Sequence, residues 1–185
     1  MILAVCGSIN KVSACELTET DEGKVLKIST AELHDTWVKN RKCDHLIIFG
    51  KLSKDAFLYL EGIAFYCETL DMSDLDIDAI PHESFIENHK LRKVILPKKL
   101  KKVEFCCFSG CYFLETVVLP EGLRGIGHGS FMDCPKLKME VSSNIRCEEN
   151  VFNRSPGVTI LDSEPMCGCC LWLWQWLSDF KEKTF

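Results

Sequence analysis

A 23-residue period dominates the middle of the chain and limits what it can fold into. Residues 91–113 read LRKVILPKKLKKVEFCCFSGCYF, and residues 114–136 read LETVVLPEGLRGIGHGSFMDCPK. A repeat of this length is typical of stacked coils, each of which buries its apolar wall only against the next. A shift of 23 pairs Leu91 with Leu114, Val94 with Val117, Leu96 with Leu119, Pro97 with Pro120, Leu100 with Leu123, Val103 with Ile126, Phe108 with Phe131 and Cys111 with Cys134.

The period continues on both sides of these two copies. Phe85 lies 23 residues before Phe108, and Ile77 and Ile80 keep the same register. Phe152 falls two residues short of the place that the period assigns to it after Phe131, which predicts a two-residue deletion in the last copy. If the coils stack in register, the phenylalanines must form a single column.

The first half of each repeat has the pattern of a strand. In Leu91-x-x-Val94-x-Leu96 the apolar residues alternate at the end, so that Lys93 and Ile95 point outward. The proline that follows, Pro97 in this copy, has no N–H for a sheet and ends the strand. The sequence therefore predicts a strand-dominated α/β fold: a leucine-rich repeat solenoid of about four coils, with parallel strands along one face. The return segment brings apolar residues from the opposite wall: Leu100, Val103 and Phe108.

These segments resemble the BspA-type leucine-rich repeats of bacterial cell-surface proteins, whose unit reads roughly L-x-x-V-x-L-P, then L-x-x-I-G, then A-F-x-x-C. The resemblance covers about residues 67–155, and the run Leu70-Asp71-Met72-Ser73 is similar to the family's first strand. Cys111 stands at the family's cysteine, and Asn88 takes this place one repeat earlier, where an amide can satisfy turn backbone groups. The resemblance implies a non-enzymatic adhesion or protein-interaction module.

The ends of a solenoid need caps. We assign residues 15–66 to an amino-terminal cap and residues 67–160 to the repeats. The cap is expected to contain a strand over Leu46–Phe49, closed by Gly50, and a helix that begins after Ser53 and runs to Phe65.

We assign residues 161–185 to a carboxyl-terminal cap. Its apolar residues at helical intervals are Leu173, Trp176, Leu177 and Phe180. The alternative is a strand-like alternation that exposes Trp172, Trp174 and Trp176 as a binding surface.

Residues 1–14 have features of an export-signal remnant: an apolar stretch, then small residues before Cys15. The segment Val12-Ser13-Ala14-Cys15 also resembles a bacterial lipobox, in which Cys15 carries lipid and anchors the protein to a membrane. These features predict a secreted or cell-surface protein, in one form an outer-membrane lipoprotein. The alternative is an unprocessed terminus, and the protein is then an intracellular scaffold or regulator.

Composition excludes other classes. Apolar residues make up 46% of the chain, which rules out wholesale disorder, and the net charge of −5 argues against a nucleic-acid partner. One basic cluster is local, and the next repeat does not continue it, so we interpret it as a solvated face. Its members are Lys90, Arg92, Lys93, Lys98, Lys99, Lys101 and Lys102.

We identify no catalytic residues, no metal site and no cofactor. Twelve cysteines include a Cys167-x-Cys169-Cys170 group, but zinc needs four ligands, and packing explains several of the others. The acidic run Asp74-x-Asp76-x-Asp78 lacks the glycine of a calcium loop. His128 is expected in a solvated turn, and no serine or cysteine nucleophile pattern accompanies it.

The expected binding surface is a row of outward residues on the parallel strands, which we call the strand strip. An apolar centre with charged residues at its rim is typical of protein interfaces. The sequence predicts that this strip binds a protein or glycan ligand. Its residues are Thr69, Asp71, Lys93, Ile95, Thr116 and Val118.

Overall fold

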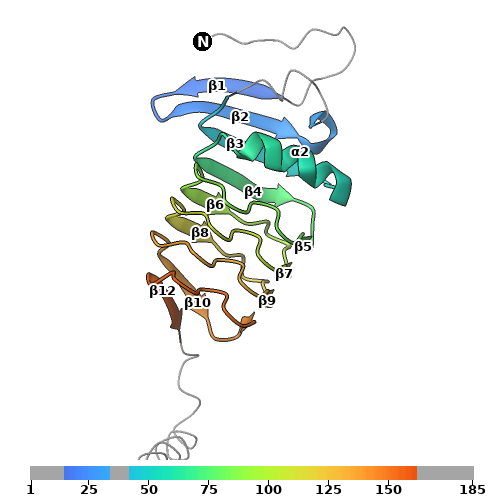
Figure 1. Ribbon diagram of the computed structural model, residues 1–185. Helices are drawn as coiled ribbons and strands as arrows, with labels where there is room; N and C mark the ends of the chain where they lie inside the picture. The colour runs from blue at the N-terminus through green and yellow to red at the C-terminus, as the bar shows by residue number, and fades with distance from the viewer. Residues whose placement is uncertain (1–14, 34–41, 162–185) are drawn as a thin grey trace, which may run out of the picture.

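The computed structural model describes residues 15–33 and 42–161, and it shows coils stacked one on another to form a solenoid (Figure 1). The predicted signal remnant over 1–14 lies outside the described residues. So does the carboxyl-terminal cap except for Leu161, including its tryptophans and the Cys167, Cys169 and Cys170 group.

The amino-terminal end begins with a hairpin that the sequence analysis missed. Strand β1 (Glu16–Thr20) pairs antiparallel with β2 (Gly23–Ser29), and a short 3-10 helix η1 (Thr30–Glu32) follows. Strand β3 (His45–Gly50) and helix α2 (Lys54–Ala64) confirm the predicted strand and helix. Ser53 caps α2 as expected, because its side chain accepts a hydrogen bond from the N–H of Ala56.

Two parallel sheets form the walls of the solenoid. The first sheet continues from β2 and β3 through β4 (Thr69–Leu75), β6 (Lys93–Ile95) and β8 (Thr116–Val118). β6 and β8 end just before Leu96-Pro97 and Leu119-Pro120, where the prolines stop the ladder. The return segments form a second, four-stranded sheet of two-residue strands: β5 (Ala79–Ile80), β7 (Lys102–Val103), β9 (Gly125–Ile126) and β11 (Arg146–Cys147).

The last coils depart from the pattern. Strand β10 (Met139–Ser142) pairs in parallel with β12 (Val158–Leu161) rather than extending the first sheet. It remains next to β8, since the N–H of Lys138 donates to the carbonyl of Glu115 at 2.9 Å. In β10 the buried side chains are Met139 and Val141, a strict alternation that differs from the spacing of the earlier repeats.

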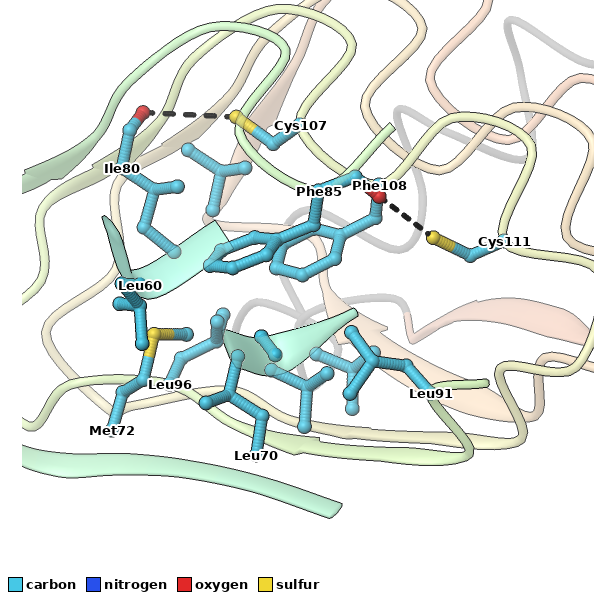
Figure 2. Packing of buried hydrophobic residues seen from close by; sticks show 14 of the residues in the cluster. Leu60, Leu70, Met72, Ile80, Phe85, Leu91, Leu96, Cys107, Phe108 and Cys111 are labelled. Carbon is cyan, nitrogen blue, oxygen red and sulfur yellow. Dashed lines mark hydrogen bonds between the residues drawn. The ribbon is translucent and has the colours of Figure 1, made fainter. Parts of the chain in front are cut away.

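A column of phenylalanine rings fills the space between the two walls, as the repeat predicted (Figure 2). Phe85 and Phe108 stack with ring centroids 5.2 Å apart, and Phe108 and Phe131 with centroids 5.3 Å apart. Phe152 continues the column at 6.0 Å from Phe131, which confirms the two-residue deletion. At the other end, Phe57 of α2 lies 6.1 Å from Phe85, so the helix closes the column.

Each coil turns twice through left-handed backbone. The two positions recur with the repeat, and mostly residues other than glycine occupy them. The first position is taken by Glu83, Cys106, Gly129 and Asn150, and the second by Glu87, Gly110, Asp133 and Arg154.

Candidate functional site

The strand strip exists as two rows across adjacent strands. In the register of the first sheet, Thr69 pairs with Lys93, and Lys93 with Thr116. Asp71, Ile95 and Val118 form the second row in the same way. Neighbouring strands lie about 4.8 Å apart, so each row places its side chains in direct succession. The six predicted residues are therefore brought together on one surface.

Burial distinguishes the two sides of these strands. Leu70, Val94 and Val117 alternate with the strip residues and point into the core, where they are almost completely buried. On the outer side, Val118 is 43% exposed and Ile95 is half-buried. The strip thus presents apolar atoms to solvent, chiefly those of Val118 on the last strand of the first sheet.

The rows extend beyond the predicted residues onto β3. His45 pairs with Thr69 and Ile47 with Asp71, so a second isoleucine stands in the row of Ile95. Neither residue was predicted from the sequence, because β3 lies outside the 23-residue repeat. The available signal was a spacing of 24 residues, which separates Ile47 from Asp71 and Asp71 from Ile95.

Two side chains at this surface are held by hydrogen bonds to the backbone. Asp71 accepts from the N–H of Ser73 at 2.9 Å, through its Oδ1 atom. The Nε2 atom of His45 lies 3.0 Å from the carbonyl oxygen of Glu22 in the hairpin. These contacts fix a carboxylate and an imidazole at the edge of the strip before any ligand binds.

The basic cluster is largely paired with carboxylates of neighbouring coils. Lys98 Nζ lies 2.8 Å from Asp74 Oδ1, and Lys99 Nζ lies 2.8 Å from Asp76 Oδ1. Each lysine donates a hydrogen bond and lowers the pKa of its carboxyl partner below the usual value. These pairs also account for the acidic run, and among the described residues no group of side chains could hold a metal ion.

Arg92, also in the cluster, lies between two glutamates of adjacent coils. Its Nη1 atom is 2.8 Å from Glu115 Oε1, and its Nε atom is 3.5 Å from Glu68 Oε2. Lys102 pairs with Glu104 at 2.7 Å. Exposed pairs of this kind contribute little to stability, and they leave the cluster without the concentrated positive charge that an anionic ligand requires.

A groove of about 950 Å³ lies beside the start of α2 and the second sheet. Its lining mixes cations and anions, including Lys51, Lys99, Asp76 and Asp78, around the edge of Phe57. Lys99 and Asp76 already pair with each other, and the lining carries charges of both signs, so the groove does not favour a ligand of one particular charge.

The buried cysteines of the repeats donate hydrogen bonds to backbone carbonyl groups. Cys107 Sγ donates to the carbonyl of Pro81 at 3.0 Å, and Cys111 Sγ to that of Phe85 at 3.1 Å (Figure 2 draws the latter). Cys134 does the same with Phe108 at 3.2 Å. Burial raises the pKa of the Cys111 and Cys134 thiols to about 12, which keeps them protonated and unreactive.

Asn88 takes the corresponding position next to the cap, as predicted. Its amide nitrogen donates to the carbonyl of Ala64 at 3.1 Å, and its Oδ1 atom accepts from the N–H groups of Lys90 and Leu91. The residue therefore ties the end of α2 to the first coil. His128 is exposed in a turn, and its backbone N–H donates to Glu148.

Comparison with known proteins shows which repeat this is. The BspA type leucine-rich repeat region matches residues 55–162 in six copies, more than half of the chain. The chain belongs to the BspA type leucine-rich repeat family. Membership suggests a protein-interaction module of a typically non-enzymatic kind, and BspA type proteins are often found at the cell surface. The six copies exceed the roughly four coils predicted from the sequence.

Among solved structures, the BspA type chain is similar to a leucine-rich repeat protein of T. pallidum. The two are 17% identical, with a TM-score of 0.42, over 83% of this chain and 64% of that one. This chain thus matches less than two thirds of that protein's length. No curated protein matches. Within the described residues, no helix has the length and apolar character that a membrane crossing requires.

Proposed function

We propose that this chain is a binding module of the cell surface or the extracellular medium, and that the strand strip contacts its partner. The observation that carries the proposal is the register of the first sheet. It sets Ile95 beside Val118 and Lys93 beside Thr116, and it continues these rows over four consecutive parallel strands, β3, β4, β6 and β8. Membership in a family of interaction modules supports it.

The partner is a protein whose surface offers an apolar patch with charges around it. Ile95 and Val118 supply adjacent apolar contacts, and Asp71 lies between them and Ile47 in the same row. Lys93 supplies a charge of opposite sign in the neighbouring row. A solenoid wall is rigid, so binding orders few groups that are not already fixed, which favours affinity. A glycan ligand would instead use Asp71, His45 and Thr69 as hydrogen-bonding groups.

The experiment is a binding screen against immobilised matrix proteins and glycans. The wild type is compared with a triple variant, Lys93→Glu, Ile95→Asp and Val118→Asp. The three replaced side chains all point away from the core. A matched control changes charge by the same amount outside the strip: Lys101→Glu, Ile86→Asp and Phe105→Asp, which replace exposed residues.

We expect the strip variant to lose binding at least tenfold and the control to bind like the wild type. Equal binding by the wild type and the strip variant would overturn the proposed surface. Circular dichroism of both variants shows whether the solenoid remains folded.

Location is tested by the intact mass of the protein isolated from its own cells. Loss of residues 1–14, with or without lipid on Cys15, supports export. In the structure Cys15 is half-buried and packs against the core, so a lipid there would leave from the hairpin end of the solenoid. An intact Met1 would contradict export and favour an intracellular scaffold that uses the same strip.

A further inference from the structure

Two buried cysteines face each other at the first coil of the solenoid. Cys43 Sγ lies 2.9 Å from Cys67 Sγ, closer than two sulfurs that are merely packed together. Cys43 is 2% exposed and Cys67 is fully buried. Cys43 comes just before β3, and Cys67 just before β4 (Figure 1 shows these two strands as neighbours).

The backbone places the two residues directly opposite each other. His45 pairs with Thr69 in parallel register, and the N–H of Glu68 donates to the carbonyl of Asp44 at 2.8 Å. Continuing the register of His45 and Thr69 two residues back sets Cys43 beside Cys67. Adjacent strands lie about 4.8 Å apart, within the roughly 4.4–6.8 Å that a disulfide allows between Cα atoms.

The repeat shows that cysteine is unusual at this position. Cys43 and Cys67 occupy the column that Leu91, Leu114 and Leu137 fill in the following coils, all of them buried. Leucine at this place fills the core with more apolar volume. Cysteine thus replaces leucine in two successive coils, and the two cysteine side chains contact each other.

The other buried thiols of the chain behave differently. Those of Cys107, Cys111 and Cys134 each donate to a backbone carbonyl. Cys67 Sγ reaches the carbonyl of Ile63 only at 3.5 Å, while its contact with Cys43 is the shorter one. That contact lowers the pKa of Cys43 and, with burial, raises the pKa of Cys67.

We propose that Cys43 and Cys67 form a disulfide bond that fastens the amino-terminal cap to the first repeat strand when the protein meets a low-molecular-weight disulfide. This inference is independent of the strand strip. The Cys43 thiolate attacks one sulfur of the small disulfide and releases the first small thiolate. Cys67, as its thiolate, then attacks the Cys43 sulfur and releases the second. The two protons of the protein thiols go to the two released thiolates, so two protein thiols are oxidised while one small disulfide is reduced to two thiols.

Burial determines when this exchange takes place. Since both sulfurs are shielded in the folded chain, the small disulfide reaches them during folding or when the cap opens locally. Once formed, the bond closes a loop that contains β3 and α2. Closing such a loop reduces the conformational freedom of the unfolded chain, and the folded state gains stability.

The test refolds the full chain with glutathione disulfide as the oxidant, and in parallel incubates the folded chain with it. The protein is then denatured, its free thiols are alkylated in the denaturant, the protein is digested without reductant, and linked peptides are identified by mass spectrometry. We expect a peptide pair joined through Cys43 and Cys67, with Cys107, Cys111 and Cys134 alkylated. The mass of the pair falls by two hydrogens relative to the reduced peptides.

Variants separate this bond from general oxidation. Cys43→Ala is expected to abolish the linked pair and the rise in unfolding midpoint that oxidation brings, while Cys106→Ala keeps both. If Cys43→Ala does not fold, the wild-type peptide map alone decides. Alkylation of both Cys43 and Cys67 after both treatments, or bridges from either to other cysteines, would overturn the proposal.

Discussion

The rings of Phe108 and Phe131 lie parallel, with centroids 5.3 Å apart and an angle of 1° between their planes. This spacing is close to the roughly 4.8 Å between adjacent strands of a sheet, so each ring is carried one coil further with almost no rotation. Both faces of Phe108 are covered, because Phe85 stacks on the other side at 5.2 Å. The column therefore couples each coil to its two neighbours.

Truncating the middle ring should be costly. Phe108→Ala leaves a cavity between two coils, and we expect the free energy of unfolding to fall by about 3–5 kcal/mol. Phe105→Ala is the matched control, since Phe105 is 43% exposed and stacks on His82 at the surface. The control should cost about 1 kcal/mol or less. Urea titration followed by circular dichroism measures both, and equal losses would show that the column is not central to stability.

Replacing glycine by alanine should have opposite effects on stability at two positions, Gly127 and Gly62. At Gly127 an added Cβ would lie 2.8 Å from the backbone of Glu104 and Phe105, so Gly127→Ala should destabilise the protein by about 1–3 kcal/mol. At Gly62 the added Cβ meets no described heavy atom within 4 Å beyond the helix's own turn. Gly62→Ala in α2 should stabilise by up to about 1 kcal/mol, because alanine favours helix. Thermal melts measure the signs, and a stabilising Gly127→Ala would contradict the close packing of the coils.

Thiol reactivity should follow burial rather than sequence. Cys111 and Cys134 should resist iodoacetamide in the folded protein at pH 8, because burial raises their pKa to about 12. Cys106 is half-buried and should react before these two, although burial raises its pKa as well. Time-resolved alkylation with mass spectrometry gives the order. Labelling of Cys111 as fast as Cys106 would contradict the observed packing.

The pair of Lys98 and Asp74 should be visible in an acid titration. The lysine lowers the pKa of Asp74, first through a hydrogen bond, so Lys98→Ala should raise it toward the usual aspartate value. A carboxyl whose pKa is lowered on folding stabilises the protein above its usual pKa, and this contribution is lost as the pH falls through the lowered value. NMR titration of the Asp74 carboxyl carbon tests this. An unchanged pKa in the variant, at low salt, would contradict the pairing.

The regular part of the fold could be predicted because residues that recur every 23 positions must occupy equivalent places in successive coils. Phe108, Phe131 and Cys111 recur at fixed spacing, and Ser53 precedes a helical pattern, so both could be placed. The hairpin β1–β2 carries no repeat and stayed hidden. The second sheet was missed because strands of two residues, such as Lys102–Val103, are too short to show an alternation.

The candidate site was predicted on three strands and missed on the fourth. Lys93 and Ile95 could be placed because Thr116 and Val118 repeat their pattern, whereas Ile47 lies before the first copy. The turns were invisible for another reason: the left-handed positions are held by Glu83 and Cys106 as well as by glycine, so no glycine pattern marks them.

The stacking of the coils in register is the claim on which the strand strip rests, and NMR tests it directly. In protein with isotopically labelled phenylalanine, a nuclear Overhauser experiment detects protons that lie within about 5 Å. We expect contacts from the ring of Phe108 to the rings of both Phe85 and Phe131, and none between Phe85 and Phe131. Ring contacts from Phe85 to Phe131, or none from Phe108 to either, would contradict the account.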